Sequence, residues 1–304
     1  MTRVLVAGGT GRLGTLVVNG LAARGIEVQV LTRDPRRAQK LAGPSVSIVV
    51  GDVRDAVTVA AAAAGVDVIV SAVHGFAGPG GGSPRSVDRA GNINLIDAAG
   101  VAGAEMVLVS VVGAAPDSPF ELFRMKHAAE SYLRASSVPA TIVRSTAFLE
   151  LWVDLLRRTA TRSGRPMIFG RGQNPINFVS VRDVAALVER VVTDPRSRGR
   201  TLEIGGPVNL TMTELAALVS PQRGGSGPPR HIPRPAMHAV AATVGRLRPE
   251  LGRQVRAALI MDRHDLKFQS GDARDRFTDL PCTAPVEVLS PPAASPDNVP
   301  PGHR

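Results

Sequence analysis

The residues with the clearest chemical signature are glycines, in the run RVLVAGGTGRLG near the start of the chain. Gly9, Gly11 and Gly14 have the spacing G-x-G-x-x-G, and the glycine before them extends it to G-x-x-G-x-x-G. Such glycines allow a tight turn, a close approach of backbone to pyrophosphate, and close packing of helix on strand. The run follows an apolar strand and opens a helix, whose N-terminal N–H groups and dipole attract phosphate. It predicts a dinucleotide site that includes Gly8, Gly9, Thr10, Gly11, Arg12, Leu13 and Gly14.

Arginines after the second predicted strand bear on which dinucleotide binds. A strand over residues 26–31 is followed by Thr32 and Arg33, with Arg37 one helical turn later. Arg12 projects from the glycine turn, so Arg12 and Arg33 should flank the place of a 2′-phosphate. NAD sites carry an acidic residue near this strand end, whereas arginine there accommodates the 2′-phosphate of NADP, which a guanidinium binds bidentately. Asp34 is the competing acidic signal, and it equally fits the N-cap of a helix that begins with proline. We therefore expect NADP(H), with NAD(H) as the less favoured cofactor.

The carboxyl ends of two further predicted strands should line the same crevice. Asp52 follows a strand over residues 47–50, where its carboxylate could accept from the adenine amino group or cap the next helix. The strand over residues 66–73 ends in small or apolar side chains that let a dinucleotide approach closely. We therefore add to the cofactor site Asp52, Val53, Ser71, Ala72 and Val73.

Lys126 is the first candidate for an acid, a base or a stabiliser of negative charge. It is one of only three lysines among 36 basic residues, so its compact ammonium stands out in a chain that otherwise uses arginine. It could hold ribose hydroxyls, which also makes it a cofactor residue, or exchange a proton once desolvated. The alternative is a surface pair with Glu130, four residues further along the same helix.

His74 is the second candidate for acid–base chemistry. It follows the fourth strand and begins a glycine-rich stretch over residues 74–84, which we expect to be a loop that covers the ligand. Its imidazole could donate a proton or contact the substrate beside the nicotinamide, or it could anchor the loop through hydrogen bonds. Phe76 in the same loop should line the substrate pocket.

Alternating strand and helix patterns must position these residues. Hydrophobic residues make up 44% of the chain but aromatic residues only 3%, which suits a parallel sheet of aliphatic side chains buried on both faces. We expect strands over residues 4–6, 26–31, 47–50, 66–73, 106–109, 140–144 and 200–204. We expect helices over residues 55–64, 87–99, 121–135, 184–192, 213–219, 235–246 and 249–268. The alternation predicts an α/β fold with a doubly wound parallel sheet.

Composition weakens several other function classes. The net charge of +10 would suit nucleic acid, but no recognition motif accompanies it, so we expect a small-molecule substrate. Cys282 is the only cysteine, which excludes an intramolecular disulfide, and the Cys/His spacing of a zinc site is absent, so no metal is expected. No apolar run could span a bilayer, and the N-terminus enters a strand without a charged leader. We expect a cytoplasmic monomer or homodimer without membrane contact.

Several segments together resemble the NmrA-like branch of the atypical short-chain dehydrogenase/reductases. They are VLVAGGTGRLG, LTRDP and KHAAESYLRASSVPATIVRSTAFLELW, and the similarity continues through INFVSVRDVAALV and LEIGGPVNLTMTELA. The resemblance implies an NAD(P)-binding Rossmann domain with a smaller C-terminal substrate lobe. We expect the Rossmann domain in residues 1–150, completed by about 177–205, the smaller lobe in 151–176 and 206–282, and a disordered, proline-rich tail in 283–304.

The resemblance also implies further site residues and shows one departure. Ser110 matches a family position at the end of the fifth strand, and Ser145 and Phe148 fall where the family builds its cofactor and substrate edge. Typical members carry a tyrosine four residues before the lysine, and that position here is Leu122. Some relatives without it reduce quinones, ethers or enones, and others only bind the dinucleotide. We expect an NADP(H)-dependent oxidoreductase that reduces a small, flat carbonyl, enone or quinone acceptor, with a non-catalytic redox sensor as the alternative.

Overall fold

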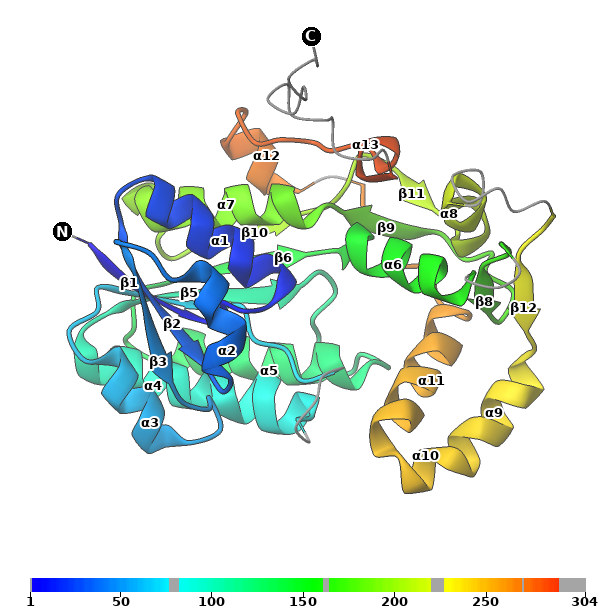
Figure 1. The fold of residues 1–304 in the computed structure, drawn as a ribbon, viewed down its shortest axis with the longest axis horizontal. Helices are drawn as coiled ribbons and strands as arrows, with labels where there is room; N and C mark the ends of the chain where they lie inside the picture. Colours follow the sequence, from blue (N-terminus) through cyan, green and yellow to red (C-terminus); the bar gives the residue numbers. More distant parts are fainter. Residues whose placement is uncertain (1, 77–81, 161–163, 220–226, 270, 290–304) are drawn as a thin grey trace, which may run out of the picture.

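The computed structural model describes the chain except for residues 1, 77–81, 161–163, 220–226, 270 and 290–304. Its largest element is a seven-stranded sheet in which neighbouring strands are parallel (Figure 1). In spatial order the strands are β10 (Thr201–Ile204), β6 (Ala140–Ser145), β5 (Glu105–Val111), β4 (Val68–Ser71), β1 (Arg3–Ala7), β2 (Glu27–Thr32) and β3 (Val46–Val50). The strand order reverses between β1 and β4, and ligands of such sheets bind in the crevice at the carboxyl ends beside this reversal. The predicted doubly wound α/β fold is confirmed.

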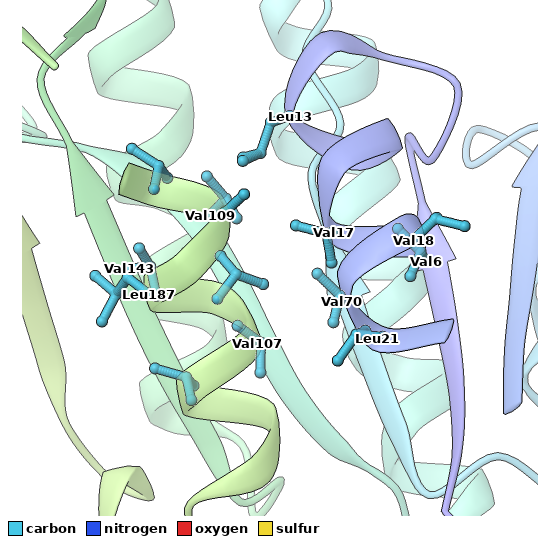
Figure 2. Packing of buried hydrophobic residues seen from close by; sticks show 14 of the residues in the cluster. Val6, Leu13, Val17, Val18, Leu21, Val70, Val107, Val109, Val143 and Leu187 are labelled. Carbon is cyan, nitrogen blue, oxygen red and sulfur yellow. The ribbon is translucent and has the colours of Figure 1, made fainter. Parts of the chain in front are cut away.

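Helices cover both faces of the sheet. One face carries α1 (Arg12–Ala23) and α7 (Val181–Thr193), which lie side by side (Figure 2). The opposite face carries α3 (Ala56–Ala63), α4 (Asn92–Ala102) and α5 (Glu121–Ala135) (Figure 1). Shorter elements complete this part of the chain, namely α2 (Pro35–Ala38), η1 (Gln39–Leu41), the π-helix η2 (Pro84–Gly91) and η3 (Pro195–Ser197).

Two aliphatic clusters hold these layers together. Successive side chains of a strand point to opposite faces, so Val6 of β1 packs beneath α1 and α7 whereas Leu5 packs beneath α3, α4 and α5. Both are completely buried. Figure 2 shows Val17 and Leu21 on the side of α1 toward α7, and Leu187 of α7 beside Val143 of β6. The unbroken apolar runs in the sequence are therefore required, because both faces of the central strands are covered.

A smaller set of elements packs beside the carboxyl ends of the large sheet. It contains a three-stranded sheet, β11-β9-β7, and a two-stranded sheet, β12-β8. These strands are β7 (Ala147–Phe148), β8 (Met167–Phe169), β9 (Ile176–Val179), β11 (Asn209–Leu210) and β12 (Arg230–Ile232). The helices are α6 (Leu149–Thr159), α8 (Met212–Val219), α9 (Arg234–Ala242), α10 (Val244–Leu247), α11 (Pro249–Met261) and α13 (Pro285–Leu289). Leu149, Phe178 and Leu215 are buried at the centre of this smaller lobe.

The segment that returns the chain to the large sheet consists of β9 and α7. β9 pairs with β7 and β11 and is not a strand of the large sheet. The helix after it starts three residues earlier than expected, because the hydroxyl of Ser180 caps it by accepting from the Arg182 N–H at 3.2 Å. Asp183 inside its first turn is completely buried and accepts from Arg274 Nη2 at 2.9 Å and Thr283 Oγ1 at 2.6 Å.

The C-terminal segment is more ordered than its composition suggests. α12 (Asp272–Arg276) lies against β10, and Ala273 and Phe277 are buried in the cluster beneath α1 and α7. α13 packs on α6 and α8 through Leu289, which is 3% exposed. The expected disorder from residue 283 onward is therefore wrong as far as Leu289, and residues 290–304 lie outside the described residues. We propose the two-lobe division as expected, but with α12 assigned to the Rossmann side.

Candidate functional site

The glycine turn between β1 and α1 is packed so tightly that side chains would not fit. An ideal Cβ on Gly14 would lie 2.2 Å from the Gly8 carbonyl oxygen, and one on Gly9 would lie 2.9 Å from a methyl carbon of Val30. Gly8 has a φ of +86°, and a Cβ there would lie 2.6 Å from the Ala72 carbonyl oxygen. The turn therefore needs glycine for both conformation and space, and it lies directly against the chain that leaves β4.

The first turn of α1 is open toward a ligand. Gly11 is its N-cap, no side chain caps it, and no acidic residue lies in its first turn. The nearest atom to an ideal Cβ on Gly11 is the Gly8 carbonyl oxygen at 3.1 Å, so space lies beside this N-terminus. Thr10 is half-buried there, whereas Leu13 is buried in the core and can offer only its backbone N–H. This cradle of free helix amides fits a dinucleotide pyrophosphate.

Arg12 has a partner that its predicted role did not include. Its Nη2 lies 2.7 Å from Oδ2 of Asp154 in α6, and both side chains are about two-fifths exposed. The pair joins the glycine turn to the smaller lobe. In this arrangement the guanidinium is directed to α6 and would have to leave Asp154 to bind a phosphate.

The end of β2 keeps the predicted arginines on the surface. The buried Thr32 hydroxyl donates to the Asp34 carbonyl and accepts from the Asp34 N–H, both at 3.2 Å. The Asp34 carboxylate caps α2 by accepting from the Arg36 N–H at 3.0 Å, so its reading as an N-cap is confirmed. Arg33 and Arg37 are both exposed beside it. An anion at this strand end would meet guanidinium groups, and the carboxylate of Asp34 is already hydrogen-bonded to the backbone.

Asp52 at the end of β3 is held by a neighbouring arginine. Its Oδ2 lies 2.6 Å from Arg54 Nη2, and its Oδ1 accepts from the Arg54 N–H at 3.0 Å. The hydrogen bond from Arg54 lowers the pKa of Asp52 below its ordinary value, and the charge of nearby Arg33 adds to this. Asp55, not Asp52, caps α3. Val53 is half-buried between them, so the predicted residues at this edge do lie together.

Polar groups at the end of β4 are turned inward. The Ser71 hydroxyl is inaccessible and donates to Asn92 Oδ1 at 2.5 Å. Asn92 Nδ2 in turn donates to the Asp88 carbonyl at 2.7 Å. The Ser71 hydroxyl therefore faces the interior, and the backbone of Ala72 and Val73 forms the side of the crevice next to Gly8.

Lys126 lies inside the protein, where its ammonium contacts two backbone carbonyls and a carboxylate. Nζ donates to the Val73 carbonyl at 3.0 Å and the Val109 carbonyl at 2.9 Å, and it lies 3.2 Å from Oδ1 of Asp88. The residue is only 4% exposed, so the alternative of a surface pair with Glu130 is wrong. Two of the three N–H donors of the ammonium make hydrogen bonds to carbonyls, and Asp88 Oδ1, which makes no hydrogen bond, forms the ion pair. In this geometry the ammonium is directed to these groups, and its catalytic and cofactor roles stay predictions.

His74 follows directly after these contacts and is exposed. Its Nδ1 accepts from the Phe76 N–H at 3.2 Å, and the two rings stack with centroids 6.5 Å apart. The neutral imidazole therefore carries its proton on Nε2. Desolvation lowers the pKa of His74 below its ordinary value, Asp88 opposes this shift and Lys126 adds to it. The expected loop begins here, but its residues 77–81 lie outside the described part of the chain.

Ser110 belongs to a buried ionic network one helical turn beyond Lys126. Its hydroxyl donates to Glu130 Oε1 at 2.5 Å, and Glu130 also accepts from Arg144 Nη2 at 2.6 Å. Glu130 is completely buried. The position that the family resemblance assigns to the cofactor is therefore used here to join β5, β6 and α5.

The two remaining predicted residues lie where β6 passes into the smaller lobe. Ser145 ends β6 and is 3% exposed, and Phe148 is half-buried against the cluster beneath α1 and α7. Trp152, one turn later, packs edge-on against Phe178 with ring centroids 6.4 Å apart. It also borders a small apolar recess of about 30 Å³, lined in addition by residues of β8, β9, α8 and α11.

Three residues near His74 were not predicted from the sequence. Asp88 and Asn92 are both completely buried, and their spacing of four residues after the glycine-rich stretch was the available signal. Arg253 in α11 donates from Nη2 to the Gly82 carbonyl at 3.0 Å. Nothing in the sequence relates two residues 171 positions apart, so this contact between the smaller lobe and the loop could not be predicted.

The described residues contain neither a cluster of metal ligands nor a membrane-spanning helix. There, no group of three or more His, Cys, Asp or Glu side chains could hold a metal ion. Likewise, no helix in the described ranges is long and apolar enough to cross a membrane. The single cysteine, Cys282, is exposed as a free thiol.

The chain is similar to several known reductases. NAD(P)H azoreductase of Xenophilus azovorans is 28% identical over 249 residues, which are 81% of this chain and 82% of that protein. The NADPH-dependent quinone oxidoreductase QOR2 of Escherichia coli, complexed with NADPH, has a TM-score of 0.76 at 21% identity, covering 94% of this chain and 98% of that one. The triphenylmethane reductase of Citrobacter sp., complexed with NADP(H), has a TM-score of 0.76 at 22% identity with the same coverage. These two structures share the fold described above.

A family model supports the same assignment from sequence. The model described as NAD(P)H-binding matches residues 8–195, which is more than half of the chain. The match begins at the glycine turn and runs through the strands that line the crevice. The chain therefore belongs to the NAD(P)H-binding family, which confirms the resemblance to the NmrA-like atypical short-chain dehydrogenase/reductases.

Proposed function

We propose that this protein is an NADP(H)-dependent reductase of small, flat carbonyl, enone or quinone acceptors. The observation that carries the proposal is the contact between the glycine turn and the end of β4, where an ideal Cβ on Gly8 would lie 2.6 Å from the Ala72 carbonyl oxygen. His74 stands two residues after Ala72. The phosphate cradle and an imidazole suited to a redox acceptor are thus adjacent on one edge of the sheet.

The preference for NADP(H) over NAD(H) rests on charge at the ends of β2 and β3. Arg33 and Arg37 are exposed there, and guanidinium groups bind a 2′-phosphate bidentately. The two carboxylates that would repel a phosphate are already occupied, because Asp34 caps α2 and Asp52 pairs with Arg54. Residues Gly8 to Gly14 would hold the pyrophosphate through backbone amides.

The cofactor, when bound, would supply the hydride. His74 would donate a hydrogen bond from Nε2 to the acceptor oxygen and so stabilise the negative charge that develops there. A lowered pKa keeps the ring neutral, which suits a hydrogen-bond donor better than a proton donor, and the proton would come from solvent. This sharpens the expected role of His74, and Lys126 takes no part in contact with the acceptor.

The acceptor class is inferred from the surroundings of His74 and from the relatives. The stacked rings of His74 and Phe76 offer a flat aromatic surface beside the Nε2 donor. The relatives reported above are named as reductases, and one of them as a quinone oxidoreductase. These names favour an enzyme over a non-catalytic redox sensor. Ser145 and Phe148 would border the acceptor at the start of the smaller lobe.

Two measurements test this function. Fluorescence titration should show NADPH binding more tightly than NADH, and Arg33→Ala should weaken NADPH binding by about tenfold and leave NADH unchanged. Arg182→Ala, an exposed arginine on α7, is the matched control and should change neither. Oxidation of NADPH should then be followed with a panel of quinones, enones and carbonyl compounds, with His74→Gln as the test variant. Tighter binding of NADH would contradict the cofactor assignment, and no turnover with any acceptor would contradict the reductase.

A further inference from the structure

A buried ion pair stands behind His74 that the proposed chemistry does not use directly. Asp88 of η2 is 0% exposed and Lys126 of α5 is 4% exposed. Their charged atoms, Oδ1 and Nζ, lie 3.2 Å apart. Burying two charges costs free energy, and such a pair is weak evidence for stability alone. Its contacts therefore need a different explanation.

The two members of the pair make hydrogen bonds with the backbone on either side of His74. Lys126 Nζ donates to the carbonyl of Val73, the residue before the histidine, at 3.0 Å. Asp88 Oδ2 accepts from the N–H of Gly75, the residue after it, at 2.8 Å. The backbone on both sides of the histidine is thus held by one ion pair.

The helix that carries Asp88 is held by hydrogen bonds at both ends. η2 is a π-helix, a form that is rare and often found at functional sites. Its start is closed by reciprocal hydrogen bonds between Ser83 and Ser86. Gly75 packs on this start so closely that an ideal Cβ would lie 2.4 Å from the Ser83 carbonyl oxygen. Its end is held by Asn92, which donates to the Asp88 carbonyl.

We propose that Asp88 and Lys126 are a positioning pair that holds the His74 peptide at the cofactor crevice and balances the charge around its imidazole. The inference rests on the proposed function insofar as His74 serves the reaction. Neither residue touches the acceptor. Their task is to keep the Nε2 donor in one place and the ring in one protonation state.

The charges around the imidazole support the balance. Asp88 reaches it from η2 and raises its pKa, whereas Lys126 reaches it from α5 and lowers its pKa. From the smaller lobe, Arg253 of α11 binds the Gly82 carbonyl in the loop that follows.

The decisive experiment is a proton NMR titration of the His74 ring in the full chain without cofactor, with the signal assigned by its loss in His74→Gln. Asp88→Asn keeps an acceptor for the Gly75 N–H but removes the negative charge, so the His74 pKa should fall. Lys126→Met should raise it. Each shift should be on the order of 0.5 to 1 unit, and the double variant should return close to wild type. Asp97→Asn, on the exposed face of α4, is the matched control and should leave the titration unchanged.

Two outcomes would overturn the proposal. One is a pair of single variants whose His74 pKa values move in the same direction or stay at the wild-type value. The other is an unchanged kcat in the double variant. This variant carries no unpaired buried charge, so it can be measured where a single variant does not fold. It should keep the wild-type Kd for NADPH but lose at least about tenfold in kcat, because the Val73 carbonyl is released; unchanged kcat would contradict the positioning role. If His74→Gln itself keeps full activity, the proposed function fails instead, and the titration still reports on the pair.

Discussion

Glu130 and Arg144 form a bidentate ion pair directly behind the candidate site. Arg144 Nη2 lies 2.6 Å from Glu130 Oε2, and Arg144 Nε lies 3.0 Å from Oε1. The pair joins α5 to β6, and Ser110 connects it to β5. Because Glu130 lies one turn beyond Lys126, this contact fixes the face of α5 that presents the ammonium to the carboxyl ends of β4 and β5.

Arg144→Met should destabilise the protein by about 3 kcal/mol at neutral pH, because it leaves a buried carboxylate without its main partner. Burial raises the pKa of Glu130, but the hydrogen bonds from Arg144 and Ser110 outweigh it and the net pKa is lowered. A folded-state pKa below the unfolded value stabilises the protein above the unfolded pKa, and this stabilisation is lost as the pH falls through the folded pKa. The difference between wild type and variant should therefore shrink in acid. Urea denaturation at neutral and at acidic pH measures this difference in the free energy of unfolding. The control is Arg134→Met, on the exposed side of Glu130, which should cost less than about 1 kcal/mol.

Gly14→Ala should damage the cofactor cradle more than the rest of the fold. The new Cβ would lie 2.2 Å from the Gly8 carbonyl oxygen and 2.7 Å from the Gly9 Cα, so the turn has to shift. We expect a loss of about 1–3 kcal/mol in stability and a loss of NADPH binding that exceeds what the stability change explains. Gly43→Ala is the control, since a Cβ there meets no atom within 4 Å. Normal NADPH affinity in a folded Gly14→Ala protein would show that this turn does not hold the pyrophosphate.

Asp154→Asn should strengthen NADPH binding. The variant releases the Arg12 guanidinium, which Asp154 holds at 2.7 Å, and makes it available to the 2′-phosphate. The pair is exposed and worth at most about 1 kcal/mol, so affinity should rise by up to about fivefold and stability should change by less than about 0.5 kcal/mol. Fluorescence titration with NADPH and NADH measures the effect, which should be absent for NADH. If NADPH affinity stays the same or falls, Arg12 has no role at the 2′-phosphate.

Asp262→Asn should loosen the smaller lobe, and more so at neutral pH than in acid. Asp262 is 3% exposed and accepts from the Gly172 N–H at 3.0 Å and from Arg234 Nε at 2.5 Å. Burial raises the pKa of Asp262, but the hydrogen bonds lower it by more, so the net pKa lies below its ordinary value. As for Glu130, a folded-state pKa below the unfolded value means that the ionised Asp262 carboxylate stabilises the protein at neutral pH. This stabilisation is lost as the pH falls through the folded pKa. Thermal denaturation across this range should show about 2 kcal/mol of destabilisation at neutral pH. Asp265→Asn, an exposed neighbour, should show little, and an equal effect at both positions would contradict the argument.

Much of the fold could be predicted from local patterns. The helix over residues 121–135 was predicted with its observed bounds, and the strands of the large sheet lie within a few residues of their expected positions. No strand was predicted at β9, and only assembly of the smaller lobe shows that this segment pairs with β7 and β11. The order beyond residue 283 was missed for a related reason, since Thr283 is held by Asp183, a residue 100 positions away.

The candidate site divides in the same way. By itself the sequence determined the glycine turn and the exposed arginines after β2, because each depends on neighbours within a few residues along the chain. It left Asp34 open between a cofactor contact and an N-cap, and the structure shows the cap. Tertiary structure alone decided what Lys126 and Arg12 bind. A charged side chain goes to the acceptors that surround it once the sheet is assembled, and these are Asp88 and two strand-end carbonyls for Lys126, and Asp154 for Arg12. A spacing of four residues suggested Glu130 for Lys126, but burial of the helix face turned the ammonium inward, where only groups from η2, β4 and β5 could compensate its charge.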